Sequence, residues 1–145
     1  MTVLILDAIR LGASAVDKHD AIAQAGTLLV SAGYVTPDYV KGMAARETIM
    51  STYIGNGVAI PHGQGDDRQY VTRTGISVLQ VPGGVTWNEG ETAYLIIGIA
   101  ALADEHIEVI GRLAELLEDE ALVMELARTT DPTAITAALS PQQSV

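Results

Sequence analysis

The 145-residue sequence contains no cysteine and no phenylalanine, and aromatic residues make up only 4% of it. The absence of cysteine excludes disulfides, thiol nucleophiles and zinc–thiolate sites, and is typical of a protein from a reducing compartment such as the cytoplasm. Because aromatic residues are so few, we expect a core of Leu, Ile, Val, Ala and Met side chains, with Trp87 and the tyrosines as the larger pieces.

Basic residues are also scarce: 8 against 18 acidic residues give a formal net charge of −10. A chain this acidic is repelled by phosphate backbones, so we do not expect nucleic-acid binding, whereas a basic protein partner would suit it. The longest strongly apolar run, residues 93–103, is too short to span a bilayer and is interpreted as a buried strand and the residues that follow it. The first residues lack the basic region of a signal peptide. We therefore expect a cytoplasmic protein.

With 48% hydrophobic and 18% charged residues, the chain has the composition of a single globular domain, residues 1–145. Helical patterns come first, then strands mixed with helices, then helices again. This order favours an α/β sandwich with a central mixed β-sheet covered by helices on both faces.

Capping residues mark the first two helices. Asp17 is suited to cap a helix that Gly33 ends, and a second helix should start at Thr36, with Pro37 in its first turn, and run to about Ile49.

The remaining segments are read from apolar runs and from proline and glycine. Asp104 is suited to cap a helix with Ile107 on its packing face. The expected strands are 58–60, 75–81 and 94–100, with a turn at 82–84, and two further helices contain Leu122 to Leu126 and open at Asp131-Pro132.

His62 is the most distinctive candidate functional residue, because it lies where a short strand ends, between Pro61 and Gly63. Pro61 fixes its own φ angle and biases Ile60 toward an extended backbone, so the imidazole should stand on a stiff platform. A neutral imidazole is a good nucleophile near pH 7. The tripeptide alone also fits a turn histidine that hydrogen-bonds to a nearby carbonyl.

The other two histidines, His19 and His106, both fall in first turns of predicted helices. We expect His19 to be solvated, and His106 to be either a polar helix residue or a functional one. The three histidines do not have metal-ligand spacing, so no metal site is expected. The glycines around Asn56 form no Walker or dinucleotide fingerprint, so no nucleotide cofactor is expected.

A longer pattern around His62 resembles a known family. Residues 46–63, RETIMSTYIGNGVAIPHG, resemble the phosphorylation-site signature of the fructose/mannitol-type IIA domains of the bacterial phosphoenolpyruvate-dependent sugar phosphotransferase system. The likeness continues in GYVTPDYV at 33–40, LIIGIAA at 95–101, EHIEVIGRL at 105–113 and LARTT at 126–130. It covers nearly the whole chain from about Ile9 to Leu139, and the mannitol branch is the most similar.

The resemblance implies a phosphotransferase component with a phosphohistidine intermediate, an α/β sandwich and no cofactor. His62 would take a phosphoryl group, on Nε2 by family precedent, from the phosphocarrier protein HPr. It would pass the group to a cysteine of a IIB domain, which phosphorylates the sugar, by likeness mannitol, as the membrane IIC domain imports it. Contact with a membrane would then come only through the permease.

Two further site residues carry over from the resemblance. Arg46 matches the arginine that opens the signature, and a guanidinium can hold two phosphate oxygens in a fork. Without the resemblance, Arg46 is interpreted as a solvated residue near the end of a helix, where its positive charge complements the helix dipole. His106 matches a second histidine that lies beside the first in the family, where it would bind the phosphoryl group or orient His62.

Two alternatives stay open. Nitrogen-type IIA proteins share the signature but use phosphorylation to control binding to target proteins. A hydrolase with His62 as its base would need a nucleophile, and the nearby Ser51 and Thr52 lack the context of a nucleophile elbow.

Overall fold

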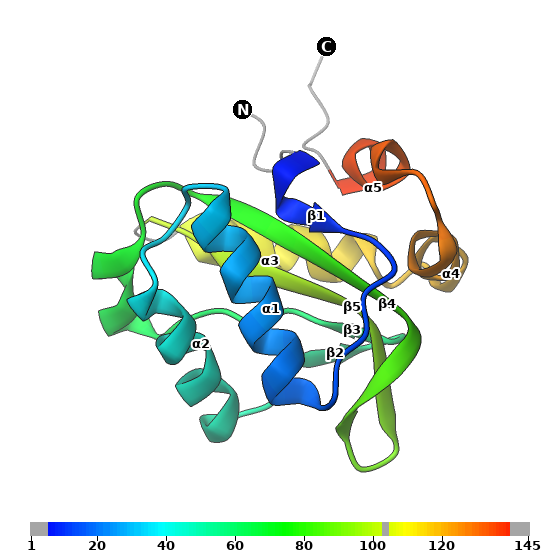
Figure 1. The fold of residues 1–145 in the computed structure, drawn as a ribbon, viewed down its shortest axis with the longest axis horizontal. Coiled ribbons are helices and arrows are strands. Elements are labelled where there is room, and N and C mark those ends of the chain that lie inside the picture. The colour runs from blue at the N-terminus through cyan, green and yellow to red at the C-terminus, as the bar shows by residue number, and fades with distance from the viewer. Residues whose placement is uncertain (1–5, 103–104, 140–145) are drawn as a thin grey trace.

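A five-stranded mixed sheet with a long central hairpin organises the fold (Figure 1). The computed structural model describes residues 6–102 and 105–139. The strand order is β1-β4-β5-β3-β2, in which β1 is parallel to β4, β4 antiparallel to β5, β5 parallel to β3, and β3 antiparallel to β2. The strands are β1 (Ile9–Arg10), β2 (Tyr53–Gly55), β3 (Val58–Ala59), β4 (Gly75–Asn88) and β5 (Glu91–Ala100).

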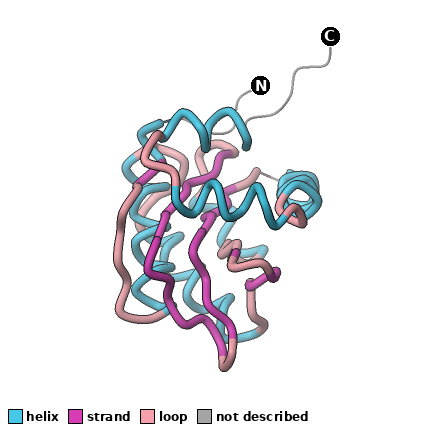
Figure 2. Tube along the Cα trace, turned by 90° about the vertical axis from the view of Figure 1, so that its right-hand side faces the viewer, coloured by secondary structure: helices cyan, strands magenta, loops and turns pink. Residues whose placement is uncertain are grey.

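Helices cover both faces of this sheet. α1 and α2 lie on one face and α3 on the other, and Figure 2 shows helices on both sides of the strands. The predicted sandwich with a mixed sheet is therefore confirmed. The helices are α1 (Lys18–Ser31), α2 (Asp38–Ile49), α3 (Glu105–Leu116), α4 (Glu120–Arg128) and α5 (Pro132–Leu139), with the 3₁₀ helices η1 (Leu6–Ala8) and η2 (Gly65–Tyr70).

The two N-terminal helices start and stop largely where their capping residues predict. The Asp17 carboxylate accepts a hydrogen bond from the Asp20 amide, and α1 ends before Gly33, whose φ angle is +83°. Helix α2 begins at Asp38 rather than at Thr36, with Pro37 as its N-cap. The Thr36 amide donates to the Tyr70 carbonyl instead, so the backbone there pairs with the end of η2 before it turns into the helix.

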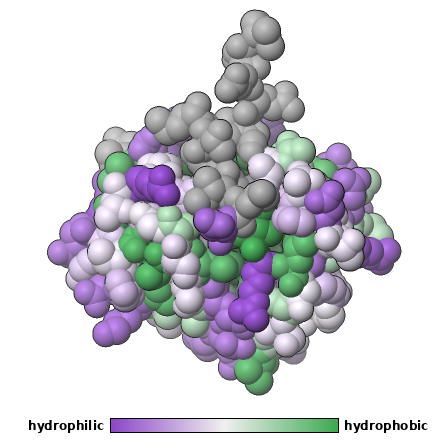
Figure 3. All heavy atoms as spheres, turned by 45° about the horizontal axis from the view of Figure 1, so that its top comes forward, coloured by the Kyte–Doolittle hydropathy of each residue, from purple (hydrophilic) through white to green (hydrophobic). Residues whose placement is uncertain are grey.

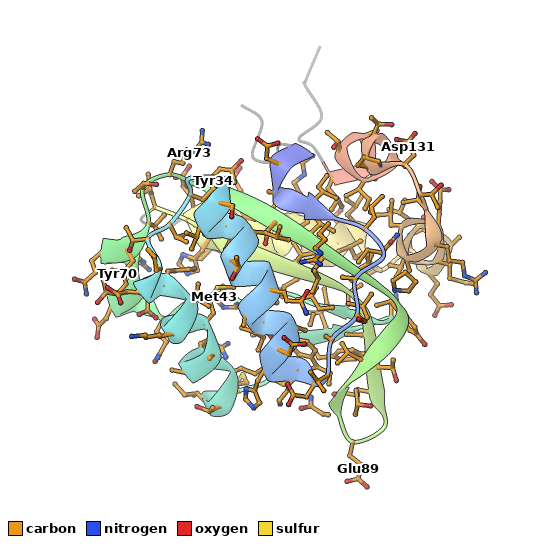
Figure 4. The ribbon with its side chains drawn as sticks, viewed as in Figure 1. Tyr34, Met43, Tyr70, Arg73, Glu89 and Asp131 are labelled. Carbon is orange, nitrogen blue, oxygen red and sulfur yellow. The ribbon has the colours of Figure 1, made fainter. Side chains whose placement is uncertain are left out.

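The turn predicted at 82–84 is wrong. Strand β4 continues through these residues to Asn88, and the hairpin turns at Glu89 and Gly90, with Glu89 at its tip (Figure 4). The pairing of β4 with β5 shifts register between Gln80 and Val85. Pro82 has no N–H to donate to a ladder, so this irregularity is a place in a strand where proline is tolerated.

The core consists mainly of aliphatic side chains from β4 and β5, packed against α1 on one face and α3 and α4 on the other. Trp87 is buried, as the sequence predicts. Ile107 does not lie on a packing face, because 65% of its surface is exposed. Asp104, expected to cap α3, lies outside the described residues.

The surface mixes small hydrophobic and hydrophilic areas over the face shown in Figure 3. Among the described residues, no helix is long and apolar enough to cross a membrane.

Candidate functional site

His62 stands just beyond the end of β3, where the strand-like pairing with β5 continues. The Ile99 amide donates to the Pro61 carbonyl at 3.0 Å, and His62 pairs with Ile99 in a parallel bridge. Pro61 is buried and the His62 ring is half-buried. The histidine is thus held by the sheet at a strand end, as its position after Pro61 predicts.

The His62 ring lines a small pocket together with residues from three other parts of the fold. Its walls include Tyr39 of α2, Arg68 of η2 and His106 of α3, together with residues 63–65, Ile99 and Ala101. The cavity volume is about 40 Å³, far below the roughly 300–1,000 Å³ of a typical small-molecule site. Such a pocket suits a small group presented from outside better than an enclosed small molecule.

One hydrogen bond determines which nitrogen of His62 carries the free lone pair. Nδ1 lies 2.8 Å from the carbonyl oxygen of Ile60. Because a carbonyl oxygen can only accept, Nδ1 must carry the hydrogen, and the lone pair of the neutral ring is then on Nε2.

The surroundings of His62 keep its ring neutral. Burial lowers the pKa of His62 from its ordinary value of 6.5, against the hydrogen bond to Ile60, which raises it. Electrostatic interactions with Arg46 and His106 lower this pKa further, and the interaction with Glu47 raises it. Near pH 7 the imidazole is therefore in its nucleophilic form.

Tyr39 fixes the segment that follows the histidine. Its hydroxyl donates to the Ile99 carbonyl at 2.7 Å and accepts from the Gly63 amide at 2.9 Å, and burial raises the pKa of Tyr39 to about 12. A side chain on Gly63 would place its Cβ 2.7 Å from the Tyr39 ring. The Pro-His-Gly sequence therefore has a structural reason for its glycine.

The structure brings two of the three predicted site residues together, since His62 and His106 line the same pocket. Arg46 is not among the lining residues. It lies in the last turn of α2, where its guanidinium donates to the Met50 carbonyl at 2.6 Å, and it acts on His62 through its charge. His19 is exposed on α1.

Sequence reasoning missed Arg68 and Tyr39 as residues of the pocket. Arg68 lies six residues after His62 in an acidic, glycine-containing segment that has no periodic pattern. Tyr39 reads as an ordinary core residue of a helix. Within the described ranges, no group of three or more His, Cys, Asp or Glu side chains is placed to hold a metal ion.

Comparison with known proteins assigns the family. Residues 2–141 match the family described as phosphoenolpyruvate-dependent sugar phosphotransferase system, EIIA 2. The chain is 52% identical over 134 residues to a multiphosphoryl transfer protein of Xanthomonas campestris, which covers 92% of this chain and 16% of that protein. It is 43% identical over 138 residues to the mannitol-specific EIICBA component of Vibrio cholerae, covering 94% of this chain and 21% of that protein. The chain thus spans about a fifth or less of these relatives.

The fold matches a solved structure of a separate IIA domain. The crystal structure of IIA mannitol from Escherichia coli superposes with a TM-score of 0.88 at 41% identity, over 94% of this chain and 98% of that one. The same fold occurs in the solution structure of the Escherichia coli complex of enzyme IIA-Mtl with phosphorylated enzyme IIB-Mtl, with a TM-score of 0.88 at 40% identity, over 94% and 96% of the two chains. This chain belongs to the EIIA 2 family of the phosphoenolpyruvate-dependent sugar phosphotransferase system.

Proposed function

We propose that this chain is a phosphocarrier: His62 accepts a phosphoryl group from phosphorylated HPr and passes it to a cysteine of a IIB domain. The observation that carries the proposal is the combination of a neutral imidazole, with its lone pair on Nε2, and a small pocket around that ring. A phosphoryl group presented by a protein donor, and removed by a protein acceptor, fits this arrangement.

The chemistry needs no base to activate His62. The Nε2 lone pair attacks phosphorus while the P–N bond to the donor histidine breaks, and the electron pair of that bond returns to the donor ring. In the second step a thiolate of the acceptor attacks the same phosphorus, and Nε2 recovers its lone pair. Arg68 lines the pocket and Arg46 is within electrostatic reach, so positive charge is available for the transferring group, and His106 lines the same pocket.

Exposed apolar residues that neighbour the predicted site residues in the chain suit a transient protein partner. Leu102 and Ile107, on either side of His106 in the chain, are 40% and 65% exposed, and Ile49 and Met50, which follow Arg46, are both 66% exposed. These apolar residues lie on an acidic protein with a net charge of −10. A donor or acceptor with a basic rim around its reactive group would be steered to such a surface.

The transported compound follows from the relatives rather than from the site. The Vibrio cholerae and Escherichia coli relatives are named for mannitol, so we propose a mannitol-type permease as the recipient of the phosphoryl group. We also place the domain in the cytoplasm, in line with its lack of cysteine. A membrane would be contacted only through the permease.

Intact-mass spectrometry tests the proposal. The protein is mixed with phosphoenolpyruvate, enzyme I and HPr, and the wild type is compared with His62→Ala and with His19→Ala as the matched control. We expect one added phosphate in the wild type and in His19→Ala, and none in His62→Ala. Labelling of His62→Ala, or no labelling of the wild type beside phosphorylated HPr, would overturn it.

Addition of a mannitol-type IIB domain tests the second step. Loss of the phosphate from this protein together with its gain by the IIB domain supports the transport role. A phosphorylated protein that passes its phosphate to no IIB domain would point instead to the regulatory role of nitrogen-type IIA proteins.

A further inference from the structure

We propose that Glu47 is a positioning residue for His62, which holds the ring through Thr52 and Ile60. The inference rests on the proposed function for its kinetic consequences, although its structural part concerns the unphosphorylated protein alone. Glu47 directly follows Arg46 in the last turn of α2, and only 3% of its surface is exposed.

The Glu47 carboxylate collects hydrogen-bond donors from separate parts of the fold. Its Oε1 accepts from the Thr52 amide at 3.1 Å and from the Thr52 hydroxyl. Its Oε2 accepts from the indole N–H of Trp87 at 3.1 Å and lies 3.6 Å from the Lys18 ammonium. Burial of a carboxylate costs free energy unless hydrogen bonds and a positive charge replace the lost water. These partners offset that cost and hold the carboxylate in one orientation.

Thr52 transmits this anchoring toward the histidine. Its side chain and amide are both bound to Glu47, and its carbonyl accepts from the Ile60 amide at 2.9 Å. The Ile60 carbonyl in turn accepts from Nδ1 of His62 at 2.8 Å. A path of hydrogen bonds through the backbones of Thr52 and Ile60 thus joins the buried carboxylate to Nδ1 of His62.

The path supports the histidine on the side where the sheet is short. Strand β3 contains two residues, β2 contains three, and their pairing has a register shift. On its other side the segment is held by β5, through the parallel pairing of β3 and the bond from the Ile99 amide to the Pro61 carbonyl. The bond between Ile60 and Thr52 lies beyond the β2–β3 ladder, so Glu47 fixes the Thr52 side of Ile60 where this ladder has ended.

The charge of Glu47 matters as well as its shape. When Nε2 carries a phosphoryl group and Nδ1 keeps its hydrogen, the ring is cationic. A negative charge on the Nδ1 side stabilises this form, in the same sense as Glu47 acts on protonated His62. Glu47 and Arg46 therefore place opposite charges around the same histidine from adjacent positions in the chain.

The test compares Glu47→Gln with Trp87→Phe. Glutamine keeps the shape of the side chain but removes its charge and half of its acceptor capacity, whereas Trp87→Phe removes one donor from the same carboxylate and leaves the contacts to Thr52 intact. Both variants are first shown to be folded by circular dichroism. ¹⁵N NMR of the imidazole nitrogens then reports the tautomer of His62, and rapid mixing with phosphorylated HPr gives the rate of phosphoryl acceptance.

In Glu47→Gln we expect a mixture of His62 tautomers, a lower His62 pKa and a maximal acceptance rate reduced by at least about tenfold, with little change in the donor concentration that gives half the maximal rate. In Trp87→Phe we expect the wild-type tautomer and rate. A folded Glu47→Gln protein with the wild-type tautomer and rate would overturn the proposal, because Glu47 would then serve stability alone.

If Glu47→Gln does not fold, Thr52→Val replaces it, since valine removes the hydroxyl that Glu47 binds. The same mixture of tautomers supports the proposal, and an unchanged tautomer with an unchanged rate overturns it. Failure of the wild type to accept phosphate would count against the proposed function, whereas the NMR comparison of unphosphorylated proteins would still decide the role of Glu47.

Discussion

Nδ1 of His62 lies 2.8 Å from the carbonyl oxygen of Ile60, two residues earlier in the chain. The two interpretations of this histidine that the sequence allows, a turn residue bonded to a carbonyl and a nucleophile, are therefore compatible. The bond to the carbonyl uses one nitrogen and leaves the lone pair on the other.

The phosphoryl group should consequently be found on Nε2. Two-dimensional NMR that correlates the ring protons with ¹⁵N and ³¹P would identify the modified nitrogen in protein phosphorylated by enzyme I and HPr. The N–P bond should break in mild acid and survive in base. Phosphate on Nδ1 would mean that the bond to Ile60 opens during transfer.

The rate of phosphoryl acceptance should persist to lower pH than it would if His62 had the ordinary pKa of a histidine. Burial lowers the pKa of His62 below 6.5, and the neutral ring is the nucleophile, so the rate should hold at pH 6.5 and fall only as the pH drops through the lowered pKa. Below 6.5 the unfolded chain binds a proton at this residue more readily than the folded one, so the free energy of unfolding also falls with falling pH.

An NMR titration of the His62 ring protons measures this pKa directly, and urea unfolding at pH 7 and pH 5 measures the linked change in stability. His62→Ala should lose less stability than the wild type between these two pH values. A His62 titration centred at or above 6.5 would contradict the assignment.

Much of the fold could be predicted from the sequence because its signals are local. Asp17 caps α1 through its own side chain and Gly33 ends it with a positive φ angle, and both signals act within one turn of the chain. The prediction of a turn at Pro82 was wrong because the pairing of β4 with β5 is not local. Proline and glycine mark a break in a ladder as well as a turn, and only the partner strand distinguishes the two.

The site was predictable only in part for the same reason. His62 and His106 carry motifs, and the structure places both in one pocket. Tyr39, Arg68 and Glu47 become relevant through contacts with residues from 5 to 60 positions away in the chain. Tyr39 and Glu47 lie in segments that resemble the family, 33–40 and 46–63, but the pattern alone does not distinguish them from a core tyrosine and a helix glutamate, and Arg68 lies outside these segments.

Removal of the Arg46 or the His106 side chain should slow phosphoryl transfer while leaving the protein folded. For Arg46→Ala and for His106→Ala we expect a loss of on the order of 2–4 kcal/mol in transition-state stabilisation, which corresponds to roughly 10²–10³ in rate. Stopped-flow or quench-flow mixing with phosphorylated HPr measures it. Arg73→Ala is the control, since Arg73 stacks on Tyr34 at 4.5 Å, and Figure 4 shows the two side chains together. Wild-type rates in Arg46→Ala and His106→Ala would reduce these residues to structural roles.

Arg68 should contribute to the same step, because its side chain lines the pocket of His62. Arg68→Ala should lower the acceptance rate by about tenfold or more, and Arg68→Lys should restore part of it, since lysine keeps the charge but not the two-pronged geometry. A variant of Arg68 with the wild-type rate at both low and high salt would show that the guanidinium does not meet the phosphoryl group.

Two tyrosines make the same kind of bridge, and this allows a matched comparison of stability with activity. The Tyr39 hydroxyl joins the Gly63 amide to the Ile99 carbonyl, and the Tyr53 hydroxyl joins the Gly57 amide to the Thr92 carbonyl. Only the first bridge borders His62. Either Tyr→Phe change leaves one backbone donor and one backbone acceptor without their partner.

Tyr39→Phe should therefore lose about 1–3 kcal/mol of stability in urea unfolding, and Tyr53→Phe should lose less because its bridge is more exposed. The two variants should also differ in their rate of phosphoryl acceptance. Without its bond to Tyr39, the Gly63 amide no longer holds the backbone next to His62, so the acceptance rate of Tyr39→Phe should fall, while Tyr53→Phe keeps the wild-type rate. Equal rates in the two variants would mean that Pro61 and the bond to Ile60 suffice to hold the ring, and that Tyr39 serves only the packing of α2 against β5.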